Sequence, residues 1–330
     1  MNNLGIQRNE KIDILKGFAI ILMVMGHSMS DIEYMTIPFN VIYSFHMPIL
    51  FYLSGYMIEA TKSKYAQTGI LYFIKRKAVS LLVPYFSWTV LVPWIYNRCS
   101  FEVLKNQLVS VTGLNGSGIW FLPVLFGLTL MYAFIWLLQK SVLHQKDSFA
   151  KDVVLLVISV MLLVMLVFIT KHPYLVNMMS YAIPFFFGVF VAKYNFVKKI
   201  IGSRSIIVAA IGLYFVLFPF FDFYDTSVMT QVKRIILSIF AIIVLWNLCR
   251  KETYQNRILR FVMLCGKYSL AIYLIHGYFS RWKLILEARD SVLLGSIISL
   301  AGSVLVCIIC VACAKILEMT KVTRKVFLGK

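Results

Sequence analysis

The stretch IDILKGFAIILMVMGHS, residues 12–28, decides the architecture of this chain. Ten residues without a charge lie between Lys16 and His27, in an apolar run at about 12–31 that is long enough to cross a membrane. Nine further apolar runs follow, at about 38–58, 79–97, 119–138, 152–170, 174–192, 205–221, 233–249, 266–284 and 292–316. The sequence therefore predicts an all-α fold, a polytopic transmembrane helix bundle of about ten spans.

The composition agrees with this architecture. Of the 330 residues, 60% are hydrophobic and 14% are charged, and the mean hydropathy is +0.82. A soluble domain carries about 25% charged residues, so the class of soluble globular proteins is excluded. No polar stretch is long enough to form a second domain, and we expect one transmembrane domain over residues 1–330.

The basic residues predict the orientation. The net charge is +19, and 25 of the 33 lysines and arginines fall in alternate gaps that share the side of the two termini. Positive residues favour the cytoplasmic side, so both termini are predicted to be cytoplasmic. A charge this high in a soluble protein would suggest nucleic acid. Here the basic groups border apolar runs, where they meet anionic lipid headgroups, and nucleic-acid binding is not expected.

Three of the five histidines fall within apolar runs: His27, His46 and His276. Counted from the ends of their runs, they lie roughly 22 Å from the inner face, 12 Å from the outer face and 15 Å from the inner face, which suggests one layer. An ionisable group at membrane depth is costly and favours a functional site. The alternative is that each imidazole bonds a neighbouring helix and only packs. His144 and His172 lie in short loops, where a solvated role is expected.

A metal site is not expected at this depth. No Asp, Glu or Cys stands at a similar level to complete a zinc site with the histidines. Cys307, Cys310 and Cys313 recur every third residue, but their run lacks polar partners, and packing explains them better than metal binding.

Lys16 and His27 are predicted to share one helix face. Eleven positions correspond to about three turns and about 16 Å along a helix. Lys16 alone reads as a lysine that snorkels to the interface. Together, a cation near the inside and a deep imidazole suit an anionic molecule with a long arm, such as coenzyme A. The triplet Lys75, Arg76 and Lys77 just before the third run reads either as a topology anchor or as a phosphate site.

Five motifs resemble the acyltransferase 3 family of multi-span membrane acyltransferases. Lys16 and His27 match its first-span pattern, a basic residue and a histidine ten residues apart, with lysine in place of the usual arginine. The other four segments are SFHMPILFYLSGYMI at 44–58, FIKRKAVSLLVPYFSW at 73–88, IWFLPVLF at 119–126 and GKYSLAIYLIHGY at 266–278. One further departure concerns two arginines three apart in the third segment, whose places are held here by Lys77 and Ser80.

The resemblance implies transfer of an acyl group, most often acetyl, from cytoplasmic acyl-CoA to a hydroxyl of a cell-envelope polysaccharide or lipid-linked sugar. It also implies a bacterial cytoplasmic (inner) membrane location. Lys16, Arg76 and Lys77 would hold the acetyl-CoA phosphates. His27 would be the general base, since imidazole titrates near neutral pH, or would carry an acyl-histidine intermediate.

The remaining candidate residues have supporting roles. His46 and His276 would orient His27 or polarise the thioester, Tyr273 would assist, and Trp120 would contact the substrate. Two other function classes remain open on the residues alone. A transporter or flippase of an envelope glycan would also use polar groups at mid-depth, without acyl transfer. A scaffold would not need the histidines.

Overall fold

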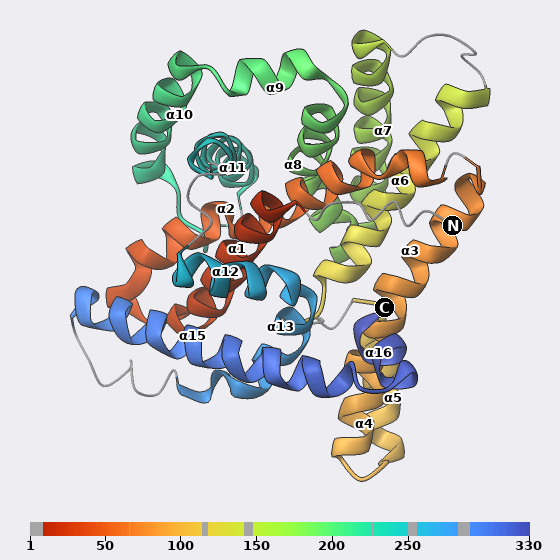
Figure 1. The fold of residues 1–330 in the computed structure, drawn as a ribbon, viewed down its shortest axis with the longest axis vertical. Coiled ribbons are helices and arrows are strands. Elements are labelled where there is room, and N and C mark those ends of the chain that lie inside the picture. The colour runs from red at the N-terminus through yellow and green to blue at the C-terminus, as the bar shows by residue number, and fades with distance from the viewer. Residues whose placement is uncertain are drawn as a thin grey trace. The chain divides into compact units, whose positions relative to one another are not determined.

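The computed structural model describes residues 9–65, 67–113, 118–141, 148–225, 227–249, 256–282 and 291–330, and within these ranges every regular element is a helix (Figure 1). The chain forms two compact units, Met1–Leu53 with Lys198–Ala314 and Ser54–Val197 with Lys315–Lys330, called the first and second units below. Whether the whole chain acts as one domain stays a prediction.

The first unit combines the N-terminal helices with those of residues 198–314, and it contains all three candidate histidines. Its elements are α1 (Glu10–Met29), η1 (Glu33–Met35), the first part of α2 (Thr36–Ala60), α10 (Arg204–Leu217), η4 (Phe218–Phe220), α11 (Val228–Leu248), α12 (Arg257–Lys267), α13 (Ser269–Ile275), η6 (His276–Trp282) and most of α15 (Val292–Leu317).

The second unit is built from the middle of the chain and its last residues. Its elements are the end of α2, η2 (Lys62–Tyr65), α3 (Gly69–Phe86), the π-helical turn η3 (Ser87–Leu91), α4 (Val92–Tyr96), α5 (Phe101–Val111), α6 (Phe121–Ser141), α7 (Phe149–Thr170), α8 (Pro173–Lys193), the start of α9 (Asn195–Ile201), the end of α15 and α16 (Lys321–Leu328).

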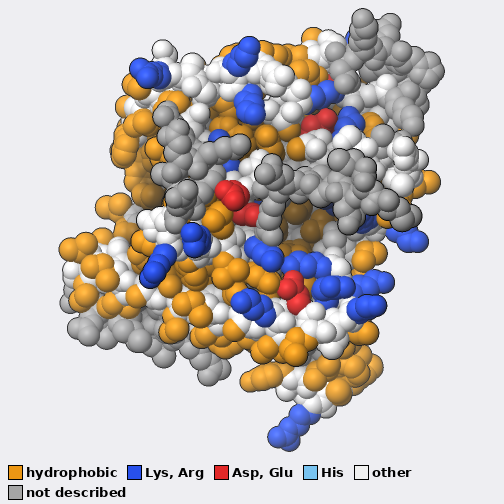
Figure 2. Space-filling model, viewed as in Figure 1, with side chains coloured by type: hydrophobic (Ala, Val, Ile, Leu, Met, Phe, Trp, Pro, Cys, Tyr) orange, Lys and Arg blue, Asp and Glu red, His pale blue; other side chains and the backbone are white. Residues whose placement is uncertain are grey.

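The predicted membrane fold is confirmed. Eight helices of the described chain are long and apolar enough to span a membrane, and two bent pairs raise the number to ten. In the most apolar of them, Phe149–Thr170, only 6% of the apolar window is buried, so this helix turns its side chains outward, as lipid contact requires. Hydrophobic side chains cover much of the face in Figure 2.

Three predicted boundaries are corrected. The third span starts at Gly69 rather than near residue 79, so the basic triplet lies inside α3 and not before it. The ninth span is not a straight helix over 266–284, because α12 and the segment that follows it are bent by 70°. The polar gap at 98–118 contains the helix α5, and residues 114–117, in the stretch predicted to be flexible, lie outside the described residues.

Two glycines bring α1 and α12 into backbone contact, where the two helices cross in Figure 1. A Cβ atom at Gly17 would lie 1.8 Å from the carbonyl oxygen of Val262, and one at Gly266 would lie 1.8 Å from that of Asp13. Small residues allow such close crossings between membrane helices. The crossing matters because α12 leads directly into α13 and so sets the place of His276.

The last helix of the chain packs on α3 within the second unit. The Ser87 hydroxyl donates to the carbonyl of Val326 at 2.8 Å, and the Trp88 indole N–H donates to that of Phe327 at 2.9 Å. These side chains therefore satisfy carbonyl groups at the end of α16 that have no partner inside the helix. Gly329 follows with φ +65°, a left-handed helix end that favours glycine.

Candidate functional site

The three predicted catalytic histidines are all in the first unit. His27 lies near the end of α1 and is exposed, His46 lies in the middle of α2 and is 2% exposed, and His276 begins η6 and is half-buried. The rings of His27 and His276 face each other with centroids 5.1 Å apart and planes tilted by 34°. The predicted neighbourhood of His27 and His276 is thus present.

Tyr43 joins the third histidine to this pair. Its ring centroid lies 6.3 Å from that of His27 and 4.6 Å from that of His46. Gly26 makes room for it, because a Cβ atom there would lie 2.7 Å from the Tyr43 ring. His46 therefore reaches His27 through Tyr43 rather than by a ring contact of its own.

Backbone carbonyls orient two of the imidazoles. His46 Nδ1 lies 2.8 Å from the carbonyl oxygen of Ile42, and His276 Nδ1 lies 2.8 Å from that of Tyr273. A carbonyl oxygen only accepts, so Nδ1 carries the proton in both rings. In the neutral imidazole the lone pair then resides on Nε2. Tyr273, the predicted assisting residue, is buried, and its ring centroid lies 6.2 Å from that of His276.

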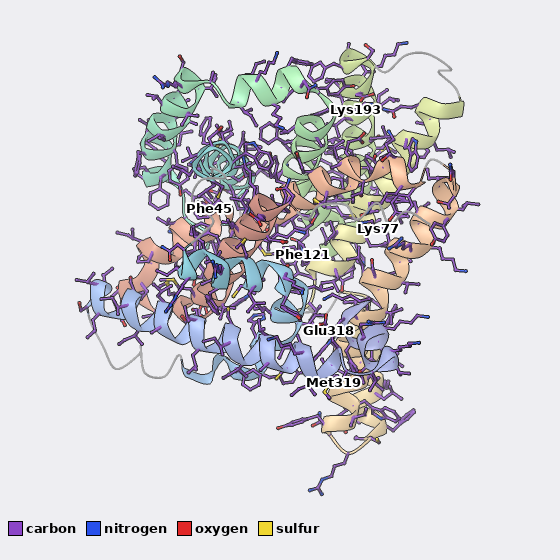
Figure 3. The ribbon with its side chains drawn as sticks, viewed as in Figure 1. Phe45, Lys77, Phe121, Lys193, Glu318 and Met319 are labelled. Atoms are coloured by element: carbon purple, nitrogen blue, oxygen red, sulfur yellow. The ribbon has the colours of Figure 1, made fainter. Side chains whose placement is uncertain are left out.

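The predicted phosphate-binding cations are divided between the units. Lys16 and His27 share the unbroken helix α1, so their spacing places them on one face about 16 Å apart along the axis. Arg76 and Lys77 belong to α3 of the second unit. Arg76 is exposed, and Lys77, which projects from α3 in Figure 3, has its ammonium 5.8 Å from the Phe73 ring centroid. A joint phosphate site stays a prediction.

Trp120 lies in the second unit, just before α6. Its ring stacks on Tyr181 of α8, with centroids 5.3 Å apart and planes inclined by 21°. Both residues are therefore part of the packing between α6 and α8. A role of Trp120 in substrate binding stays a prediction.

Comparison with known proteins decides the family. A family model described as an acyltransferase domain, that of the acyltransferase 3 family, matches residues 9–314. The chain belongs to the acyltransferase 3 family. The match covers every histidine of the cluster and all five motifs.

One curated relative is similar over a shorter stretch of this acyltransferase 3 protein. It is the nodulation protein NolL of Sinorhizobium fredii (strain NBRC 101917 / NGR234), 33% identical over 92 residues, which are 26% of this chain and 24% of that protein. The chain thus matches about a quarter of the relative's length. No solved structure matches the chain.

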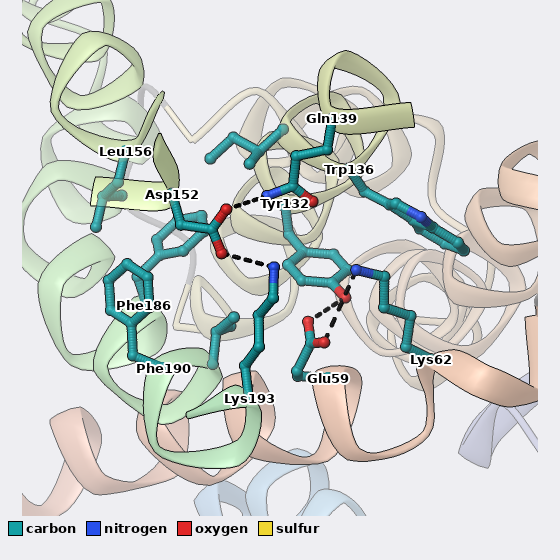
Figure 4. Close-up of a pocket in the computed structure, with 12 residues that line it drawn as sticks. Glu59, Lys62, Tyr132, Trp136, Gln139, Asp152, Leu156, Phe186, Phe190 and Lys193 are labelled. Carbon is teal, nitrogen blue, oxygen red and sulfur yellow. Dashed lines mark hydrogen bonds and ion pairs between the residues drawn. The ribbon is translucent and has the colours of Figure 1, made fainter. Parts of the chain in front are cut away.

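This acyltransferase 3 protein also has a polar cluster in its second unit that sequence reasoning missed (Figure 4). The Asp152 carboxylate is buried and accepts hydrogen bonds, each of 2.6 Å, from Gln139, Lys193 and Tyr194. Across the cluster, Glu59 accepts from the Tyr132 hydroxyl at 2.6 Å. The space between them is about 20 Å³, room for about one water molecule. Since the carboxylates are satisfied by these donors, the cluster stabilises the unit and offers little room for a substrate.

Sequence reasoning also missed the aromatic partners of the histidines. Phe39, Tyr43 and His46 recur at helical spacing, so one face of α2 carries all three, and this signal was available. Tyr224 stacks on Phe39 with centroids 5.3 Å apart, but it lies far along the chain, and no local pattern joins it to α2.

Proposed function

We propose that this acyltransferase 3 protein transfers an acetyl group from cytoplasmic acetyl-CoA to a hydroxyl of a cell-envelope polysaccharide or lipid-linked sugar. The bacterial cytoplasmic membrane is the proposed location. The observation that carries the proposal is the exposed imidazole of His27 set against the oriented imidazole of His276, inside a chain of this family.

His27 is the proposed general base. It takes the proton of the acceptor hydroxyl while that oxygen attacks the thioester carbonyl carbon. The C–S bond then breaks, and the departing sulfur receives the proton from His27. An ester and free coenzyme A are the products, and no oxidant or reductant is needed.

His276 suits the role of a residue that positions the base. Its Nδ1–H donates to the Tyr273 carbonyl, so Nε2 is the hydrogen-bond acceptor of the neutral ring. A base oriented by a further group is the recurring arrangement at sites that activate hydroxyl nucleophiles. His46 acts one step further away, through Tyr43.

Lys16 supports the proposed use of coenzyme A. It stands about 16 Å from His27 on the same face, so its ammonium can hold phosphates while the long arm of the donor reaches the imidazole. Lysine attracts phosphate as a point charge and lacks the bidentate fork of arginine. Arg76 and Lys77 are proposed as further phosphate contacts.

Radiolabelled acetyl-CoA provides the test. Purified protein is incubated with it, and label is followed to candidate glycans and to the protein itself. His27→Ala should lower transfer by about 10²–10⁴-fold, the range for loss of a general base. His172→Asn is the matched control, because it removes an imidazole while asparagine keeps the capping acceptor at the start of α8. Equal transfer by wild type and His27→Ala would remove His27 from the reaction.

Two outcomes separate the alternatives. Label that stays on wild-type protein but not on His27→Ala indicates an acyl-histidine intermediate rather than direct transfer. Altered glycan export with no acylated product indicates a transporter or flippase, a class that also uses bent helices near its sites.

Lys16→Ala should weaken donor binding and leave the protein folded, whereas Lys16→Arg should retain most activity.

A further inference from the structure

A cavity of about 170 Å³ opens beside the histidine cluster, in the first unit. It lies beyond the end of α1, and its lining comes from the turn after α1, from η1 and the start of α2, and from the loop after η4. The lining residues are Met29, Asp31, Ile32, Glu33, Thr36, Phe39 and Tyr224. The space admits one pyranose-sized ring.

Two aromatic rings form one wall of this cavity. The Phe39 and Tyr224 rings are nearly parallel, with planes inclined by 9°. Phe39 is 2% exposed and anchors the pair in the core, whereas Tyr224 is 49% exposed and offers a ring face. Such a face attracts the apolar C–H face of a sugar ring, because the π-system carries negative charge density.

The loop that carries Tyr224 is held in place. The backbone N–H of Phe223 donates to Asn40 Oδ1 at 3.1 Å, and the Phe223 ring packs against Phe39 and Tyr43 at 5.4 and 4.5 Å. The backbone N–H of Asp31 donates to the Tyr224 hydroxyl at 3.0 Å. The aromatic wall is therefore formed before a ligand arrives, which lowers the entropy cost of binding.

Two carboxylates also line the cavity, and that of Asp31 lies beside the Tyr224 hydroxyl. Asp31 and Glu33 are both exposed, and Asp31 has φ +63°, a left-handed conformation that a residue other than glycine adopts at some cost. Such backbone strain gathers at functional sites. Ionised carboxylates only accept hydrogen bonds, so they suit hydroxyl or ammonium donors and repel an anionic ligand.

The cavity is continuous with the proposed catalytic cluster. Met29, in its lining, follows His27 by two residues. The Tyr43 ring centroid lies 6.3 Å from that of His27 and 4.0 Å from that of Phe39, so one side chain contacts both the proposed base and the aromatic wall. A ring stacked on Tyr224 is thus one aromatic side chain away from His27.

We propose that this cavity binds the sugar ring of the acceptor, and that it selects neutral or amino sugars over sugar acids. The inference rests on the proposed function only in treating the bound sugar as the acyl acceptor, and sugar binding can be measured without acyl transfer. Tyr224, backed by Phe39, stacks on the sugar ring, and Asp31 and Glu33 accept hydrogen bonds from its polar edge. The hydroxyl to be acylated is the one turned toward His27.

Saturation-transfer NMR on the full-length protein in detergent tests the proposal, with glucose, glucosamine, N-acetylglucosamine and glucuronate as probes. Wild type should bind the first three and not glucuronate. Tyr224→Ala should raise their Kd by about three- to tenfold, the scale of one aromatic contact. Tyr224→Phe should keep the stacking. Phe220→Ala is the matched control, since Phe220 is an exposed aromatic residue just before the same loop and outside the lining.

The double variant Asp31→Asn, Glu33→Gln gives a readout that loss of folding cannot mimic. It should gain binding of glucuronate relative to glucosamine. The proposal is overturned if wild type binds none of the sugars, if it binds glucuronate as well as glucosamine, or if neither Tyr224→Ala nor the double variant changes binding. Sugar binding without acetyl transfer from acetyl-CoA would instead sink the proposed function and leave the sugar site standing.

Discussion

His46 and His276 are alike in one respect that separates them from His27. Each holds its Nδ1 against a backbone carbonyl four or three residues earlier in the chain. The rings are therefore oriented by the backbone rather than by a substrate. His46 is also fully enclosed, and a group that cannot be reached has to act through its neighbours. At the level of single residues, the cluster divides into one accessible imidazole, the proposed base, and two imidazoles oriented by the backbone.

Asp225 is expected to stabilise the start of α11 in a pH-dependent way. Its carboxylate accepts from the Ser227 backbone and hydroxyl, both at 2.8 Å, and from the Thr230 hydroxyl at 2.5 Å. The hydrogen bond from Thr230, followed by those from Ser227, lowers the pKa of Asp225 below 3.8, its ordinary value. The stabilisation is therefore complete above the unfolded-state pKa and is lost as the pH falls through the folded-state pKa.

Hydrogen exchange measures this effect. In Asp225→Ala, amides at the start of α11 should exchange faster than in wild type at pH 7. The difference should begin to shrink as the pH falls below about 4, the ordinary range of this carboxyl, and should vanish only below the lowered folded-state pKa, where the wild-type carboxyl is also protonated. Amides at the start of α10, which is capped by the Ser203 hydroxyl, serve as the internal reference. A difference that is constant across this pH range would contradict the assigned cause.

At the scale of helices, the crossing of α1 and α12 depends on two glycines. Gly266→Ala adds a methyl group whose carbon would lie 1.8 Å from the Asp13 carbonyl oxygen, so the helices have to separate. Overpacking of this kind costs about 1–3 kcal/mol. We expect a lower midpoint of thermal unfolding, and lower acyl transfer because α12 carries His276 toward His27.

Gly212→Ala is the matched control for this substitution. Gly212 also lies in a helix of the first unit, α10, but a Cβ atom there has nothing within 4 Å. Alanine in a helix interior is favoured over glycine by about 1 kcal/mol, so this variant should unfold at the same or a higher temperature. Equal shifts in both variants would show that the α1–α12 crossing does not need its glycines.

The helices themselves were predictable, and their breaks were not. All ten apolar runs coincide with helices, because burial of backbone groups in lipid requires them. Hydropathy averages composition over a window, so it did not reveal the bend at Tyr268 or the early start of α3 at Gly69. For the site, the shared face of Lys16 and His27 was predictable, because both residues lie in one helix and their spacing alone sets their relative direction. Tyr224 could not be found, since its contacts join distant segments of the chain.

For the whole chain, contacts within the first unit indicate that both bent helix pairs cross the membrane. One pair is α9 with α10, and the other is α12 with α13 and the start of η6. Asp31 and Tyr224 touch, so the loops after α1 and after α10 lie on one side. Five spanning helices lie between these loops, and a sixth crossing by α9 and α10 is needed for the loops to meet. Likewise, Gly266 lies against Asp13 and His276 against His27, positions about 21 Å apart along α1.

Reporter fusions should therefore find ten crossings. With ten, residues 221–227 are external and residues 250–256 cytoplasmic; with eight, the two loops exchange sides while both termini keep theirs. The charges favour ten, because Arg250, Lys251, Arg257, Arg260 and Lys267 follow α11, whereas the loop at 221–227 holds Asp222 and Asp225.

A reporter inserted at 222–226 should read external. Reporters at 250–256, at 61–68 between α2 and α3, and after Lys330 should read cytoplasmic. The fusion at 97–100 is the positive control for the outer side, since both the eight- and ten-crossing arrangements place it there. A cytoplasmic signal at 222–226 would contradict the crossing by α9 and α10. Because α1 crosses in both arrangements, Asp31 stays external, so a cytoplasmic Tyr224 could not reach it, and the proposed sugar cavity that both residues line would be contradicted as well.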